Sequence, residues 1–327
     1  MKDLVDKLEA EMKENNGVVR PLHLVKIMSI NFMVVLCFGP DCQDENFVNE
    51  LEELIAEGII LNENMDVLLE SLPLFRYFVP SQAASLKRWK SLKAHVLHLI
   101  LPLVQFGCIF KGYFEQNAPN CFLNCLLSIG DREGGEGKKR LSEEEIVFNL
   151  FEIFILSVDS MSTAVEWALA YMIRHPDVQR KVHEETREAV SWDNTECLVD
   201  LEKLPFLAAV VKETLRKEAI APLAVVHETV EECKVMGITI PAKAGVIINL
   251  DAISNDPRLW NDPGDFKPSR FLGEVDSDKM RMAYLPFGAG RRICAGMDVA
   301  SVHIPITLAN LIINFSGPVR MKGSLQI

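Results

Sequence analysis

Apolar residues recur every three or four positions through the first two-thirds of the chain, which is the spacing of one face of an α-helix. The pattern predicts four early helices, over residues 3–12, 22–37, 46–56 and 85–101. A polar, glycine-rich stretch, residues 130–140, then breaks the periodicity and predicts a surface loop. The amino-terminal part of the chain is therefore expected to be helical.

A longer helix is expected to begin after Ser142. Glu145 follows three residues later, which completes a capping box. The apolar pattern continues to about Arg174, and His175-Pro176 ends it because the residue before a proline is displaced from the helical region. A helix of this length, apolar on much of its circumference, indicates a central and buried position.

After two further helices, expected over residues 177–190 and 206–217, the pattern changes to that of strands. Stretches 225–229, 234–240 and 245–250 have strand composition and are separated by turn residues. A last helix is expected over residues 295–315, with a kink or an early end at Pro305, since an interior proline costs ~3 kcal/mol. The predicted fold is mainly α with a small β element, in a single domain over residues 1–327.

Charge and cysteine usage narrow the class of protein. The chain has 34 basic and 46 acidic residues, a net charge of −12, which argues against a nucleic-acid binder. Its 8 cysteines show no pairing rhythm, which is typical of a reducing compartment. The most apolar stretch, residues 96–110, is interrupted by polar residues and falls short of the ~20 apolar residues of a membrane span. The first residues form a charged amphipathic pattern, so no signal peptide or membrane anchor is expected.

The most specific chemical feature is the segment 287–296, FGAGRRICAG. Its glycines allow the backbone to pass close to a flat group, and Cys294 opens a helix. A helix amino terminus and neighbouring arginines favour the thiolate, which is a soft metal ligand and serves as the proximal ligand of some haem irons. A buried structural cysteine is the alternative. The spacing F-x-x-G-x-R-x-C-x-G fixes five residues within ten and favours the haem ligand.

At these residues the chain resembles the cytochrome P-450 family. The resemblance implies that Cys294 is the axial ligand of haem b and that Arg292 pairs with a haem propionate. It also implies that Phe287 shields the sulfur, with Gly290 and Gly296 in the same cofactor-binding loop.

A second motif supports the resemblance. Glu213 and Arg216 are three residues apart and share a helix face, which on its own is most often a surface pair. In the family, such an E-x-x-R pair joins an arginine of F-x-P-x-R-F, which corresponds here to Arg270 in residues 266–271. The resemblance therefore implies a buried charge network that supports the cysteine loop and takes no part in the chemistry.

Asp159 and Ser160 lie side by side in the long apolar helix, where polar groups are costly unless well bonded or functional. The family has an acid–alcohol pair here that relays protons, although Leu156 and Ser157 replace its small residues. A polar stripe facing solvent is the alternative. His227 follows a strand-like stretch where relatives often place a propionate partner, and a structural histidine is equally compatible with that position.

The resemblance, closest to plant microsomal members and their secondary metabolism, implies a haem-thiolate monooxygenase. Such an enzyme inserts one oxygen atom from dioxygen into an apolar small molecule, with electrons from NADPH through a partner NADPH–cytochrome reductase. It implies the cytosolic face of the endoplasmic reticulum membrane, and a chain without the family's amino-terminal anchor, first strands and first helices. The alternatives are a catalytically silent relative, with or without haem, and a reductase-independent isomerase or dehydratase. The Asp159–Ser160 pair argues against the isomerase or dehydratase.

Overall fold

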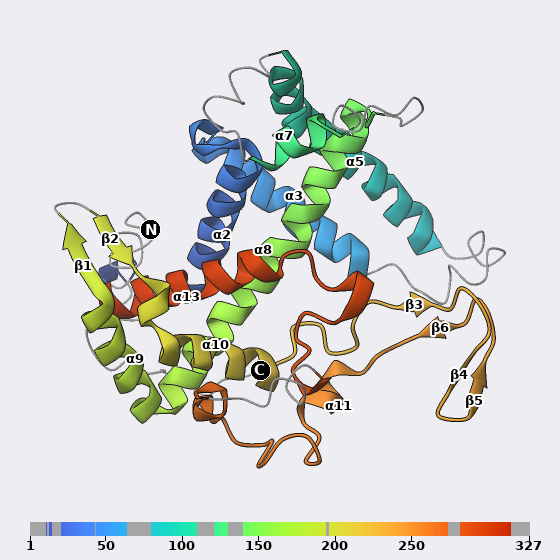
Figure 1. Cartoon of the computed structure of the whole chain (residues 1–327). Coiled ribbons are helices and arrows are strands. Elements are labelled where there is room, and N and C mark those ends of the chain that lie inside the picture. The colour runs from blue at the N-terminus through green and yellow to red at the C-terminus, as the bar shows by residue number, and fades with distance from the viewer. Residues whose placement is uncertain are drawn as a thin grey trace. The chain divides into compact units, whose positions relative to one another are not determined.

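The computed structural model describes residues 11, 13–14, 21–42, 44–63, 80–109, 121–129, 140–193, 196–273 and 282–314. Contacts within the chain define two compact units, one of residues 23–159 and the other of residues 160–327 together with residues 1–22. The boundary between the units falls inside the long helix α8, Glu143–Arg174, which contributes to both (Figure 1). The prediction of a single domain stays a prediction.

The described part of the unit of residues 23–159 contains helices and connecting segments but no strand. It contains α2 (Pro21–Phe38), η1 (Pro40–Cys42), α3 (Glu45–Glu63), α5 (Pro80–Ile109), α7 (Phe122–Leu127) and the first half of α8. Phe38 at the end of α2 stacks on Phe154 of α8, with ring centroids 6.2 Å apart. A Cβ at Gly58 would lie 2.8 Å from Cδ1 of Ile155, so this glycine of α3 allows a close approach to α8.

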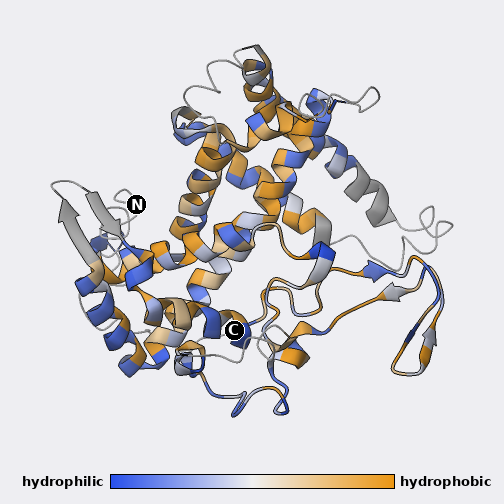
Figure 2. Cartoon of the chain, viewed as in Figure 1, coloured by the Kyte–Doolittle hydropathy of each residue, from blue (hydrophilic) through white to orange (hydrophobic). Residues whose placement is uncertain are grey.

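The unit of residues 160–327 combines helices with three small antiparallel sheets. After α8 come α9 (Pro176–Ala189), β1 (Val190–Asp193), β2 (Glu196–Val199), η3 (Leu201–Lys203) and α10 (Pro205–Lys217). The chain continues with β3 (His227–Glu228), β4 (Cys233–Val235), β5 (Ile238–Ile240), β6 (Gly245–Val246), α11 (Leu250–Ser254), η4 (Pro268–Phe271), η5 (Gly290–Arg292) and α13 (Met297–Asn314). The sheets pair β1 with β2, β3 with β6 and β4 with β5. Helices α9, α10 and α13 pack against one another, and hydrophobic residues gather along α13 (Figure 2).

The start of α8 confirms the predicted capping box. The backbone N–H of Ser142 donates to Oε2 of Glu145 at 2.7 Å, and the backbone N–H of Glu145 donates to Oγ of Ser142 at 3.2 Å. Three acidic residues, Glu143, Glu144 and Glu145, occupy the first turn, where they complement the helix dipole. The helix ends at Arg174, directly before His175-Pro176, as the sequence predicts.

Other predicted elements are confirmed with changed bounds. The strand-like stretch 234–240 forms the hairpin of β4 and β5, and residue 250, predicted to end a strand, begins α11. The hairpin of β1 and β2 was not predicted, because its two strands are only 4 residues each. The predicted helix over 3–12 and the predicted loop over 130–140 lie outside the described residues, apart from residues 11 and 140.

Two helices continue past an internal proline. Of the kink or early end predicted at Pro305, the early end is wrong, since α13 reaches Asn314, close to the predicted residue 315. Helix α5 continues through Pro102 to Ile109. A helical proline leaves the carbonyl four residues earlier without its N–H donor. Those carbonyls belong to Ser301 and His98, which are both exposed, so water can bind them. The cost of each proline is thereby reduced, and the helices persist.

Within the described residues, three helices are long and apolar enough to cross a membrane: Pro21–Phe38, Lys87–Cys108 and Glu143–Arg174. The prediction that no segment reaches that length is therefore wrong. The prediction was based on uninterrupted apolar runs, and the first of these helices contains polar residues such as Asn31. The Asn31 side chain donates to the carbonyl of Ile27 within the same helix, so its amide has a hydrogen-bond partner there. Part of this helix is covered by protein, because Val25, Ile30 and Val34 are buried.

Candidate functional site

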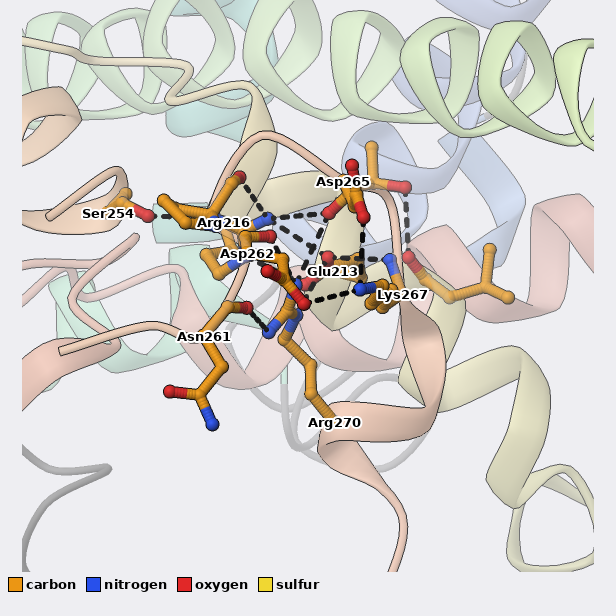
Figure 3. A network of polar contacts seen from close by, with 11 residues as sticks. Glu213, Arg216, Ser254, Asn261, Asp262, Asp265, Lys267 and Arg270 are labelled. Atoms are coloured by element: carbon orange, nitrogen blue, oxygen red, sulfur yellow. Dashed lines mark hydrogen bonds and ion pairs between the residues drawn. The ribbon is translucent and has the colours of Figure 1, made fainter. Parts of the chain in front are cut away.

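Glu213 and Arg216 on α10 form the most deeply buried ion pair of the described structure (Figure 3). Both side chains are fully buried, and the contact is bidentate, with Nε donating to Oε2 at 2.8 Å and Nη2 donating to Oε1 at 2.9 Å. Such parallel bonds are among the strongest that proteins make. The helix places the two residues on one face, as their spacing predicts.

Arg270, from η4, completes a three-residue network. Its Nε donates to Oε1 of Glu213 at 3.0 Å, and the backbone N–H of Lys267 donates to the same oxygen at 2.8 Å. Trp260 lies against both arginines, with its ring centroid 5.3 Å from the guanidinium of Arg216 and 6.0 Å from that of Arg270. The structure therefore brings together all three side chains that the sequence predicts in a buried network.

The network also holds the segment of residues 254–270 against α10. Arg216 donates to the backbone carbonyls of Ser254 at 2.7 Å, Pro263 at 3.1 Å and Asp265 at 3.3 Å. Arg270 donates to the carbonyl of Asn261 at 2.8 Å. The two guanidinium groups thus satisfy backbone oxygens of a segment with little regular structure, which fixes its course.

A neighbouring contact was not predicted. Tyr171, near the end of α8, donates its hydroxyl to Oε1 of Glu218, which follows α10. Burial, together with the acceptor carboxylate, raises the pKa of Tyr171 well above its ordinary value. The ring of Tyr171 stacks on Phe266, with centroids 4.3 Å apart. Tyr171 and Glu218 are 47 positions apart in the sequence, which gave no signal for the pair.

The loop that carries Cys294 is shaped by glycines and by one backbone bond. Gly288 and Gly290 both have φ of +73°, a left-handed conformation that favours glycine. The N–H of Cys294 donates to the carbonyl of Phe287 at 2.9 Å, which closes the loop. Helix α13 begins at Met297, so Cys294 precedes a helix amino terminus, as predicted.

This loop fits a haem, the group that the sequence resemblance implies. The Cys294 side chain is exposed, and no atom lies within 4 Å of the position a Cβ would take at Gly288 or Gly290. A Cβ at Gly296 would lie 3.8 Å from the Cys294 sulfur. A flat cofactor with an axial sulfur ligand requires an accessible thiol and a neighbouring backbone that carries no bulky side chains. The Cys294 loop has both features.

The proposed propionate partners are accessible as well. Arg292 is exposed at the end of η5. His227 is exposed on β3, opposite Val246 of β6, and its Nδ1 lies 2.7 Å from the carbonyl oxygen of Val225.

Asp159 and Ser160 lie in the middle of α8. Oδ1 of Asp159 forms an ion pair with Nζ of Lys26 on α2 at 2.7 Å, a contact that sequence reasoning missed. The available signal was that Lys26 is the one charged ammonium or guanidinium residue of residues 21–38, in an otherwise apolar pattern. Leu156, on the same helix, is 66% exposed although its neighbours Phe154 and Val158 are buried.

A family model described as Cytochrome P450 matches residues 1–324. Among curated relatives, piperic acid synthase of Piper nigrum is 33% identical, with 99% of this chain and 62% of that protein covered. The (S)-canadine synthase of Coptis japonica is 33% identical, covering 99% and 63%, and the pluviatolide synthase of Sinopodophyllum hexandrum is 32% identical, covering 99% and 63%. The chain thus spans less than two-thirds of the length of these relatives.

Solved structures give the same assignment for the fold. Two structures of zebra fish cytochrome P450, one with abiraterone and one with progesterone, cover 95% of this chain and 68% of theirs. Their TM-scores are 0.72 and 0.75, at 24% and 25% identity, which confirms the predicted mainly α fold. The chain belongs to the cytochrome P450 family.

Proposed function

We propose that this chain is the larger part of a haem-thiolate monooxygenase, with Cys294 as the axial ligand of haem b. The single observation that carries the proposal is the exposed Cys294 in a glycine-shaped loop at the start of α13. When bound, the haem supplies the activation of dioxygen, from which one oxygen atom is inserted into the substrate. The protein's own residues hold the cofactor and deliver protons.

The loop residues have distinct roles in this proposal. Phe287 covers the sulfur of Cys294, while Gly290 and Gly296 leave room for the cofactor plane. Arg292 and His227 are exposed donors for the haem propionates. The buried network of Glu213, Arg216 and Arg270 holds residues 254–270 against α10 and so stabilises the part of the fold in which the loop lies.

Asp159 and Ser160 deliver protons in this proposal. A carboxyl group and a hydroxyl group can each pass a proton to a group within hydrogen-bond distance, directly or through one water molecule. Both side chains are partly exposed on α8, so Asp159 can be reprotonated from water after each transfer.

We assign the substrate to apolar small organic molecules and the electrons to NADPH through a partner NADPH–cytochrome reductase. The relatives are plant enzymes whose names are those of synthases of small organic compounds, which supports a role in plant secondary metabolism. The membrane of the endoplasmic reticulum, on its cytosolic face, is the location that this redox partner implies.

The test of the proposal is the absorption spectrum of the haem-loaded chain after reduction and binding of carbon monoxide. A thiolate-ligated Soret band is expected, and Cys294→Ala should remove it. Cys233→Ala is the matched control, because Cys233 is also exposed in the same unit but lies on strand β4. A folded chain that binds no haem, or a Soret band that survives Cys294→Ala, would contradict the proposal.

One observation favours a second candidate, a haem-binding protein without turnover. Leu156 places an exposed, bulky side chain where the family has a small residue, which would restrict access over the cofactor. NADPH-dependent product formation with the reductase distinguishes the two candidates. Product formation supports the monooxygenase, and a thiolate-ligated spectrum without any turnover supports the silent binder.

A further inference from the structure

The contact between Lys26 and Asp159 joins helices that are far apart in sequence. Nζ of Lys26, on α2, lies 2.7 Å from Oδ1 of Asp159, on α8, and both residues belong to the unit of residues 23–159. The Lys26 side chain is 30% exposed and that of Asp159 is 45% exposed. The pair is therefore partly removed from water, where an ion pair is screened less than at the open surface.

The backbones that carry the two residues are fixed by their neighbours. Val25 and Ser29 beside Lys26 are buried, and so is Val158 directly before Asp159. Further along α2, Phe38 stacks on Phe154 of α8. The ion pair thus forms between two helices whose backbones are held in place by buried neighbours.

A relay acid needs one orientation. Proton transfer takes place between heavy atoms about 2.6–3.2 Å apart, so a carboxylate that rotates among the three staggered χ1 positions spends only part of its time within reach of its acceptor. An ammonium group held at one side of the carboxylate selects one of these positions. Lys26 occupies that place for Asp159.

We propose that Lys26 is a positioning residue of the proton relay, which holds the Asp159 carboxylate in one orientation. The inference rests on the proposed function, in which Asp159 and Ser160 deliver protons. It assigns to α2 a part in the chemistry that the family motifs do not indicate. Without Lys26, the carboxylate samples other orientations, and proton delivery by Asp159 becomes slower.

The orientation of the Asp159 carboxylate is expected to change how the electrons from NADPH are divided between oxidised product and hydrogen peroxide. When protons are delivered in order, two electrons and two protons per dioxygen give one oxidised product molecule and one water molecule. When delivery fails, the same two electrons and two protons leave as hydrogen peroxide. The ratio of product to peroxide per NADPH therefore reports on the relay, and a variant of a different ion pair in the same unit measures the part of any change that comes from a general loss of structure.

The experiment compares four variants of the haem-loaded enzyme with its reductase. Lys26→Met should lower product per NADPH about threefold, the number of χ1 positions then available, and raise peroxide correspondingly. Lys26→Arg keeps the ion pair and should restore the parent ratio. Asp159→Asn removes the relay acid and should lower the ratio further. Arg88→Met removes a different ion pair of the same unit, Arg88–Glu57 at 3.5 Å, and should leave the ratio unchanged.

A measurement without turnover accompanies this comparison. In urea unfolding of the chain, Lys26→Met and Asp159→Asn should each lower the midpoint, and the double variant should lower it by less than the sum of the two losses. Additive losses would show that the two side chains are not coupled and would overturn the inference.

The outcomes separate the inference from the function on which it rests. If Asp159→Asn lowers the ratio of product to peroxide and Lys26→Met does not, the relay stands and the role of Lys26 is wrong. If Lys26→Met and Arg88→Met lower it equally, the effect is a general loss of structure and the inference is also wrong. If Asp159→Asn leaves the ratio unchanged, the relay itself is wrong.

Discussion

At the scale of single residues, the Arg216 side chain combines a buried ion pair with several hydrogen bonds to the backbone. It pairs with Glu213 and donates to three backbone carbonyls while fully buried. Removing one partner of a buried ion pair leaves an uncompensated charge, which typically costs ~3–5 kcal/mol. Arg216→Met is expected to lower the free energy of unfolding by about that amount, measured by urea denaturation.

The control for Arg216→Met is Arg258→Met. Arg258 also pairs with a carboxylate, that of Asp256, but its side chain is 87% exposed. Exposed pairs contribute little to stability. Equal losses in the two variants would contradict the view that burial makes the Glu213–Arg216 pair indispensable.

His303 on α13 gives the molecule a pH-dependent stability. It is 4% exposed, and burial lowers its pKa from 6.5 to about 4. Below pH 6.5 the unfolded chain binds a proton that the folded chain does not bind until the pH approaches 4. Stability is therefore full above pH 6.5 and falls as the pH drops, by roughly 3 kcal/mol at ~1.4 kcal/mol per pKa unit. His303→Gln should reduce the fall in the free energy of unfolding between pH 6.5 and 4, measured by urea denaturation, and an unchanged slope would contradict this assignment.

The residue scale also shows where sequence reasoning works and where it stops. The Glu213–Arg216–Arg270 network was predicted because two short motifs resemble those that join in the family. The partners Lys26 of Asp159 and Glu218 of Tyr171 were not, because each pair is formed by packing of helices distant in sequence. The spacing of residues along the sequence predicts which side chains share a face of one helix or strand. It does not predict which side chains meet when two helices pack.

At the scale of elements, α10 depends on a carboxylate from another helix. Leu204, its N-cap residue, provides no side-chain cap, and the second and third residues of the helix, Phe206 and Leu207, have N–H groups without a partner inside the helix. Glu185 of α9 accepts from both, at 2.7 and 2.8 Å. The start of the helix that carries Glu213 is thus fixed from α9.

Glu185→Ala is expected to lower the free energy of unfolding by about 2 kcal/mol, at the upper end for a lost cap, because two donors lose a charged acceptor. Glu185→Gln keeps one acceptor oxygen and should lose about half as much. Thermal or urea unfolding gives both values. Glu188→Ala, an exposed change on the same helix, is the control, and a loss as large as that of Glu185→Ala would refute the capping role.

The element scale explains the errors in the predicted bounds. The beginning and end of α8 were predicted because a capping box and a proline signal them locally. The continuation of α5 past Pro102 and of α13 past Pro305 was not predicted, because each proline frees the carbonyl of an exposed residue, and exposure is a property of the fold. The end predicted for the last helix, residue 315, lies one residue from the observed end at Asn314. The β1–β2 hairpin was missed since its pairing lies between strands too short to show a period.

At the scale of the whole molecule, the proposed cofactor-binding residues are concentrated in one compact unit. Cys294, Arg292 and His227 all belong to the unit of residues 160–327, together with the network of Glu213 and its arginines. Helices α2, α3 and α5 belong to the unit of residues 23–159. A ligand stabilises the structure to which it binds in preference to the unfolded form.

Hydrogen exchange of the chain with and without haem is expected to show this division. Amides of the loop 285–296 and of the start of α13 should exchange more slowly once haem is bound, because local opening would then require its release. Amides of α2, α3 and α5 should keep their rates. Cys294→Ala is the control, since it removes the proposed ligand while leaving the loop glycines in place, and it should abolish most of the added protection. Protection spread evenly over both units would show that haem stabilises the whole chain against global unfolding. It would contradict the assignment of the cofactor-binding residues to one unit.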